Sequence, residues 1–128
     1  MGKAENFKEE VSKVAGLSHQ NLVYYYGYHS NANYIRPGKE SVKVDYIVEE
    51  LVNGKELFDY VANVGGFDER ICRAIFRQSL DALEYLHSQG MCHRDLKLEN
   101  IMLEKNGNVK LIDFGLAMKL EGRYGDGW

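Results

Sequence analysis

The residues best suited to chemistry lie around an Asn-Gly pair in the last third of the chain. Apolar runs at 101–103 and 109–112 flank Asn106-Gly107. This dipeptide is the strongest short-range signal for a β-hairpin, because a type I′ turn needs two residues with positive φ. With a two-residue loop, the facing pairs run outward until Asn100 faces Asp113, and directly opposed residues lie about 5 Å apart at Cα. We therefore expect an amide oxygen and a carboxylate to meet there, as hard ligands that suit Mg²⁺.

Two ordered motifs flank this hairpin. Residues 93–100 read H-R-D-L-K-L-E-N, and residues 113–115 read D-F-G. The first stretch fits every defined position of the catalytic-loop pattern H-R-D-L-x-x-x-N, and the second follows in the order that goes with this pattern. On these motifs the chain resembles the eukaryotic protein kinase family. Lys97, two residues after Asp95, is the choice of Ser/Thr kinases, and the style is that of the calcium/calmodulin-dependent and AMP-activated kinase group.

The resemblance covers the chain from about Phe7 to Trp128. The matching segments, in the family's terms, are the C helix (7–17), the turn into the fourth strand (18–23), the fifth strand (46–51), the hinge (50–53) and the end of the E helix (83–90). The resemblance implies an α+β fold, as a fragment of the bilobal kinase fold with its D helix, catalytic loop and hairpin of the seventh and eighth strands. Residues 1–52 would form an incomplete small lobe and 53–128 the first half of the large lobe.

The resemblance also implies roles for the polar residues of the two motifs. Asp95 would accept or orient the proton of the substrate hydroxyl, and Lys97 would neutralise the γ-phosphate as charge moves. Asn100 and Asp113 would hold the Mg²⁺ that bridges the ATP phosphates. Arg94 would pair with a phosphorylated activation loop through a charge-assisted contact. The implied activity is that of an ATP-dependent protein serine/threonine kinase with ATP and Mg²⁺ as cofactors.

A second set of implied roles concerns the nucleotide and the substrate. Backbone groups of Glu50 and Val52 would meet the adenine, and Met102 would form the floor beneath it. Glu56 would meet the ribose. Together with Glu99, it would also receive basic side chains of a protein substrate, so we expect basic residues N-terminal to the target Ser or Thr.

Some positions depart from the family's pattern. Glu10 falls where the C-helix glutamate belongs, although Glu9 beside it offers an alternative register. Glu49 stands at the back of the adenine pocket, where an apolar residue is usual, so its carboxylate must be desolvated, paired or turned outward. Residues 1–6 cannot hold the glycine-rich loop and the lysine that grip the phosphates, and no A-P-E motif precedes Trp128. We therefore expect the 128-residue chain alone to bind Mg·ATP weakly and to transfer no phosphate.

Hydrophobic periodicity predicts the elements that position these residues. They are helices at 5–17, 57–64 and 68–88, strands at 22–28 and 42–51, a long connection at 30–41 and the hairpin described above. Asp68 is the expected N-cap of the third helix, and Ile71, Ile75, Ala82 and Leu86 form its apolar stripe, which Leu80 and Leu83 widen. His93 is interpreted as a packed core histidine, because no second His or Cys stands at ligand spacing.

Composition excludes several classes. The chain has 128 residues with 16 basic and 19 acidic side chains, for a net charge of −3. That length suits one domain or a piece of one, and a mildly acidic chain is a poor nucleic-acid binder. No apolar run approaches the roughly 18 residues of a membrane helix. We expect an intracellular, cytoplasmic protein whose partners are protein substrates, without nucleic acid and without a membrane segment.

Three interpretations follow. The first is the middle part of an active Ser/Thr protein kinase. The second is a kinase-derived pseudokinase or interaction module without transferase activity; the missing upstream motifs and Glu49 favour it. The four residues Asp95, Lys97, Asn100 and Asp113 oppose the second interpretation, since a binding module needs none of them. The third is an unrelated α+β binding domain in which the motifs occur by chance.

Overall fold

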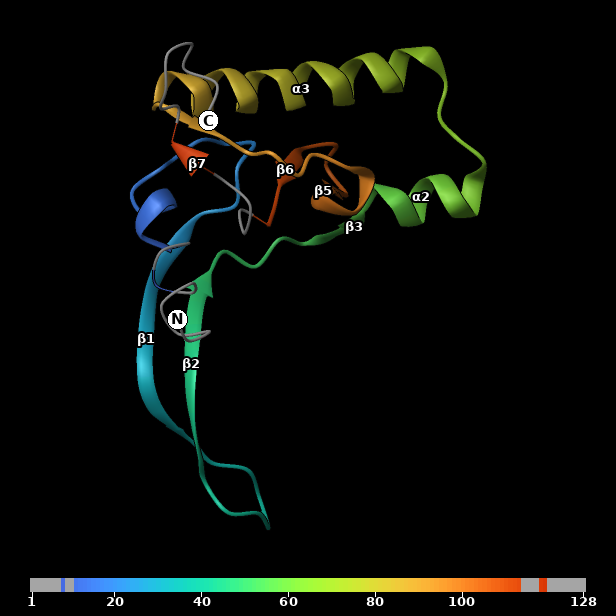
Figure 1. Cartoon of the computed structure of the whole chain (residues 1–128). Helices are drawn as coiled ribbons and strands as arrows, with labels where there is room; N and C mark the ends of the chain where they lie inside the picture. Colours follow the sequence, from blue (N-terminus) through green and yellow to red (C-terminus); the bar gives the residue numbers. More distant parts are fainter. Residues whose placement is uncertain (1–7, 9–10, 114–117, 120–128) are drawn as a thin grey trace.

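The computed structural model describes residues 8, 11–113 and 118–119 (Figure 1). Its elements are β1 (Tyr25–Tyr34), β2 (Val42–Glu49), β3 (Gly54–Glu56), α2 (Leu57–Val64), α3 (Glu69–Ser88), β4 (Met91–Cys92), the 3₁₀ helix η1 (Leu98–Asn100), β5 (Ile101–Glu104), β6 (Val109–Leu111) and β7 (Met118–Lys119). The strands form three antiparallel sheets, β1-β2, β3-β5-β6 and β4-β7. Helices beside antiparallel sheets agree with the expected α+β class. No helix in the described residues is long and apolar enough to cross a membrane.

The helices follow their sequence signals closely. α2 covers the predicted residues, and α3 begins one residue after its predicted cap. The carboxylate of Asp68 accepts a hydrogen bond from the Ile71 backbone N–H at 2.9 Å, which satisfies one of the free donors of the first turn. Ile75, Ala82 and Leu86 are buried as expected, but Ile71 and Leu80 are exposed. The apolar stripe of α3 is therefore narrower than predicted. Of the predicted helix at 5–17, Lys8 and residues 11–14 are helical in the described part.

The first two strands form a ribbon that projects from the rest of the chain (Figure 1). The predicted strand at 22–28 and connection at 30–41 are both partly wrong, because β1 continues to Tyr34 and pairs with β2 over most of that stretch. Two register shifts, between Tyr25 and Gly27 and between His29 and Ala32, accommodate the pairing. Asn31 lies in one shift at φ +54 and donates its backbone N–H to the Asp45 carboxylate at 2.8 Å. The local polar contact explains why periodicity alone missed this part of the strand.

The β5-β6 hairpin exists, but its register differs from the prediction by one residue. Ile101 pairs with Leu111, Met102 with Lys110 and Leu103 with Val109. The loop therefore has three residues, and of these only Gly107 has a positive φ, +86. A type I turn followed by a left-handed glycine is the usual three-residue loop, whereas a type I′ turn would need positive φ at both central residues.

The change of register corrects the expected pairing at the open end of the hairpin. Asn100 accepts a backbone hydrogen bond from Ile112 at 2.9 Å. Asp113 comes one residue later and does not face Asn100 directly.

A short strand that the sequence did not reveal completes the central sheet. β3 pairs with β5, so that Gly54 faces Glu104 and Glu56 faces Met102. A Cβ atom at Gly54 would lie 2.3 Å from the backbone oxygen of Leu103. Glycine is therefore required for β3 to approach β5, and this approach places Glu56 beside Met102.

The core lies where α3, the β5-β6 hairpin and the segment before β1 meet. Its fully buried side chains include Val14, Leu22, Leu86, Val109 and Leu111. The segment before β1 also joins the hairpin through its backbone, since Leu111 N–H donates to Asn21 at 2.8 Å and Val23 N–H to Leu111 at 3.0 Å. This core holds the hairpin rigidly against α3.

Candidate active site

The side chains of Asp95, Lys97 and Asn100 lie close together. The amide nitrogen of Asn100 donates to the Asp95 carboxylate at 3.0 Å and to the Asp95 backbone oxygen at 2.8 Å. The ammonium of Lys97 lies 3.6 Å from the other carboxylate oxygen of Asp95. Asn100 is buried, and Asp95 is half-buried. An acceptor, a cation and an amide thus lie within one hydrogen-bonded cluster.

His93 connects this cluster to the segment that carries Asp113. Its side chain is 2% exposed, and its Nδ1 accepts the Asp95 backbone N–H at 3.1 Å. Its Nε2 lies 2.9 Å from the backbone oxygen of Ile112. Since Nδ1 accepts, the proton belongs on Nε2, which then donates to Ile112. The interpretation of His93 as a packed core histidine is consistent with this burial, and the side chain links the two motifs.

Two of the motif residues adopt a left-handed backbone. Arg94 has φ +66 and Asp113 has φ +58. Residues other than glycine pay for this conformation in free energy, and such residues cluster at functional sites where the surrounding structure holds them. His93 bonds to Asp95, the residue after Arg94, and to Ile112, the residue before Asp113. These two hydrogen bonds supply part of that restraint.

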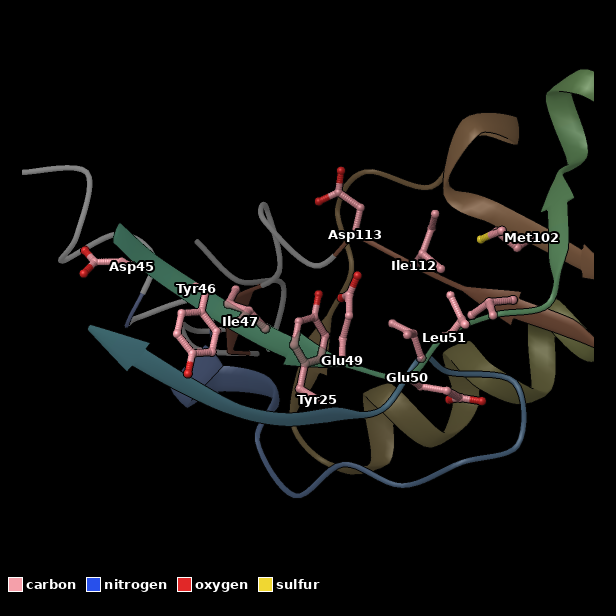
Figure 2. Close-up of a pocket in the computed structure, with 12 residues that line it drawn as sticks. Tyr25, Asp45, Tyr46, Ile47, Glu49, Glu50, Leu51, Met102, Ile112 and Asp113 are labelled. Carbon is pink, nitrogen blue, oxygen red and sulfur yellow. The ribbon is translucent and has the colours of Figure 1, made fainter. Parts of the chain in front are cut away.

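A pocket of about 630 Å³ opens beside Asp113 (Figure 2). Its lining residues are Val23, Tyr25, Asp45, Tyr46, Ile47, Glu49, Glu50, Leu51, Val52, Met102, Ile112 and Asp113. The structure therefore places three of the predicted cofactor-binding residues, Glu50, Val52 and Met102, around one cavity with Asp113. Glu10, a fourth, lies outside the described residues.

The two predicted substrate-facing glutamates lie outside this lining set. Glu56 ends β3 and Glu99 lies in η1, and both are half-buried. Because β3 and η1 contact each other, the two glutamates come from neighbouring elements. Arg94 is exposed.

The structure shows where the carboxylate of Glu49 points. Its side chain lines the pocket and rises from β2 toward the segment of Asp113 (Figure 2). The pKa of Glu49 is raised above its ordinary value, first by partial burial and second by the negative charge of Asp113. The side chain of Glu49 has no hydrogen bond or ion pair among residues 11–113. The carboxylate is therefore turned into the pocket rather than paired.

The geometry suits a nucleotide and a divalent cation. A cavity of this volume with mostly apolar walls falls within the usual range of small-molecule sites. The two hydrogen bonds that Asn100 donates through its nitrogen orient the amide, so its side-chain oxygen is left as a potential metal ligand. Within the described residues, no cluster of three His, Cys, Asp or Glu side chains could hold a metal by itself. Mg²⁺ commonly takes one or two protein ligands plus phosphate oxygens, so a large cluster is not required.

Two groups of positioning residues were missed by sequence reasoning. Lys110 is buried and forms an ion pair with Glu50 at 2.9 Å. Asn21 is fully buried and donates to Gln78 at 3.0 Å, to Asn108 at 3.3 Å and to the Val109 backbone at 2.8 Å. The available signal at Lys110 was a charged residue within an apolar run. This signal does not identify the partner, because Glu50 lies 60 residues away in sequence.

Comparison with known proteins identifies the family of the chain. Residues 1–125 match the protein kinase domain family. Sperm motility kinase 2B of Mus musculus is 48% identical over 82 residues, which cover 64% of this chain and 17% of that protein. CBL-interacting protein kinase 24 of Oryza sativa subsp. japonica is 41% identical over 110 residues, covering 86% and 22%.

A third relative comes from another plant. CBL-interacting serine/threonine-protein kinase 9 of Arabidopsis thaliana is 42% identical over 113 residues, covering 88% of this chain and 23% of that protein. The chain thus spans less than a quarter of the length of these three relatives. The family match covers nearly every residue and includes both motifs around the hairpin. The chain belongs to the protein kinase family, and it resembles the serine/threonine kinases of that family.

Proposed function

We propose that the protein containing this chain transfers the γ-phosphate of ATP to Ser or Thr of protein substrates. The observation that carries the proposal is the cluster of Asp95, Lys97 and Asn100, which His93 ties to the segment of Asp113. Phosphoryl transfer relies on positioning and charge neutralisation, and this cluster offers an acceptor, a cation and metal ligands in one place. A pseudokinase or interaction module would have no need of these residues together.

The residues divide the work of the reaction. Asp95 orients the substrate hydroxyl and accepts its proton, while Lys97 stabilises the negative charge that moves through the transferred group. Asn100 and Asp113 would hold Mg²⁺. When bound, this ion supplies charge neutralisation at the ATP phosphates. One hydrogen bond from Asn100 keeps the carboxylate of Asp95 oriented before substrate arrives.

The pocket is proposed to hold the nucleotide base. Backbone groups of Glu50 and Val52 meet the adenine, and Met102 lies beneath it. Glu56 reaches the ribose, and Glu10 is proposed to serve the phosphate end, as the family resemblance implies. In this scheme residues 1–52 form an incomplete small lobe and residues 53–128 the first half of the large lobe, with the pocket between them.

Protein substrates are proposed to approach from the side of Glu56 and Glu99. Two carboxylates favour arginine or lysine N-terminal to the target residue, because an Arg–carboxylate pair is strong and directional. Arg94 is proposed to pair with a phosphorylated activation segment. No role is proposed for nucleic acid, and we place the reaction in the cytoplasm.

The replacement Asp95→Asn tests the proposed transfer reaction directly. It should lower kcat by about 10²–10⁴-fold, the usual worth of a positioned acid–base group. The measurement is transfer of radiolabelled γ-phosphate to a Ser/Thr peptide by the protein containing this chain. Asp81→Asn, an exposed carboxylate on α3, is the matched control and should transfer normally. Normal transfer by Asp95→Asn would refute the assignment.

A further inference from the structure

Lys110 is a buried cation with a single acidic partner in the described residues. It is 9% exposed, and its ammonium lies 2.9 Å and 3.1 Å from the two carboxylate oxygens of Glu50. A buried charge is costly unless it is paired, and removal of one partner leaves the other uncompensated. The pair therefore constrains both residues more strongly than an exposed ion pair would.

Lys110 belongs to the same sheet face as the proposed pocket floor. It pairs directly with Met102 across β5-β6, and directly opposed residues on antiparallel strands share a face. Ile112, two residues further along, continues the same face, and both Met102 and Ile112 line the pocket. The Lys110 stem thus lies next to the floor, while its ammonium reaches the segment that follows β2.

That segment, residues 50–53, has no regular structure; Val52 packs against the core, and Glu50 makes the hydrogen bonds of the segment. The Glu50 backbone N–H donates to Tyr24 at 2.7 Å, and the Glu50 carboxylate accepts from the Tyr24 N–H at 3.2 Å and from Lys110. Within residues 11–113, no hydrogen bond is found for Leu51, Val52 or Asn53, and Leu51 is 92% exposed. The polar contacts that hold the start of the segment over the pocket are therefore made at Glu50, while the packing of Val52 and the pairing of Gly54 with Glu104 hold its far end.

We propose that the Lys110–Glu50 ion pair sets the distance between segment 50–53 and the pocket floor, which makes Lys110 a positioning residue of the nucleotide pocket. The inference rests on the proposed function, because it assumes that this segment meets the adenine. Lys110 acts through Glu50 and does not touch the nucleotide. Its loss should weaken recognition of the base and leave recognition of the phosphates unchanged.

The first test compares three variants of the protein containing this chain. Lys110→Met keeps an unbranched side chain one atom shorter and removes the charge, Lys110→Arg keeps the charge, and Lys43→Met is an exposed lysine control on β2. Calorimetry measures the binding of Mg·ATP, adenosine and Mg·tripolyphosphate to each. We expect Lys110→Met to weaken binding of ATP and adenosine on the order of tenfold, since small misplacements are costly, with tripolyphosphate binding unchanged. Lys110→Arg should restore most of the affinity.

Equal affinities for ATP and adenosine in Lys110→Met and the control would overturn the inference. So would equal weakening for tripolyphosphate, which would indicate general loss of structure. A protein that binds none of the three probes before substitution refutes the proposed function instead.

A second measurement tests the ion pair independently of nucleotide binding. The amides of Tyr24 and Glu50 are hydrogen-bonded in the contacts that hold the start of the segment. Their hydrogen exchange should accelerate at least several-fold in Lys110→Met relative to amides of α3, and should return in Lys110→Arg. Unchanged exchange at Tyr24 and Glu50 would show that the ion pair does not hold the segment.

Discussion

The two hairpins of this chain differ in how much of their surface is buried. The β1-β2 ribbon has two strands, projects from the body and exposes apolar side chains such as Tyr34 and Ile35, the latter 75% exposed. The β5-β6 hairpin is shorter, yet Val109 and Leu111 are fully buried against α3 and the segment before β1. An isolated two-stranded ribbon is marginally stable, whereas packing on a third element supplies most of a hairpin's stability.

The difference explains where the candidate catalytic residues lie. Asn100 and Asp113 adjoin the buried hairpin, where His93 and the core hold their backbone in place. A site requires geometry maintained within fractions of an ångström. The longer ribbon contributes Tyr25 of β1 and four residues of β2 to the wall of the pocket, namely Asp45, Tyr46, Ile47 and Glu49, and none of the catalytic-motif residues.

The largest expected effect comes from removing the carboxylate next to the buried hairpin. Asp113→Ala should abolish Mg·ATP-dependent transfer, because Asp113 is the proposed charged ligand of the metal. Glu40→Ala, a matched loss of an exposed carboxylate near the tip of the ribbon, should leave transfer unchanged. The radiolabelled assay measures both, and substantial transfer by Asp113→Ala would contradict the assigned role.

Truncation of a side chain should lower the free energy of unfolding more in the β5-β6 hairpin than in the β1-β2 ribbon. Leu111→Ala removes a fully buried side chain and should lower the free energy of unfolding by about 2–5 kcal/mol. Ile35→Ala at the exposed end of the ribbon should change the free energy of unfolding by less than about 0.5 kcal/mol. Urea unfolding followed by circular dichroism measures both. Equal losses would show that the ribbon is packed in solution.

A smaller effect is expected at the substrate side. The double replacement Glu56→Gln/Glu99→Gln should reduce the preference for basic residues N-terminal to the target, as measured by a peptide-library screen. Single ion pairs at an exposed rim contribute about 0–1 kcal/mol, so each single replacement should matter little. A library preference for acidic residues before substitution would already exclude the proposed substrate class.

The smallest effect is expected at Glu49. Its folded-state pKa is raised, so ionisation is disfavoured in the folded chain. The free-energy cost of ionising Glu49 in the folded chain is absent when the pH lies below the ordinary carboxyl pKa. It appears as the pH rises through that pKa and is complete above the folded-state pKa. Glu49→Gln should therefore gain stability over the unsubstituted chain with rising pH and match it in acid. Thermal unfolding between pH 4 and pH 7 measures this difference in stability. A stability advantage of Glu49→Gln that shrinks with rising pH would contradict a raised pKa of Glu49.

Local signals predicted a large part of this fold. α2 covers the predicted residues, and the capping carboxylate of Asp68 located the start of α3 to within one residue, because helix ends are decided by nearby side chains and backbone. The Asn106-Gly107 pair located the hairpin but not its register. Both two-residue and three-residue loops accept this dipeptide, and the choice depends on which register buries Val109 and Leu111.

The motifs by themselves determined the family and the identity of the candidate catalytic residues. Asp95, Lys97 and Asn100 lie within six residues, so their pattern is recognisable in the sequence without knowledge of the fold. Only the tertiary structure decided that His93 joins them to Ile112, that Glu49 turns into the pocket and that Lys110 pairs with Glu50. These contacts join residues 19 to 64 positions apart. A pairing over such a separation is selected by burial of the surrounding core rather than by local preference, so no local pattern in one sequence reveals it.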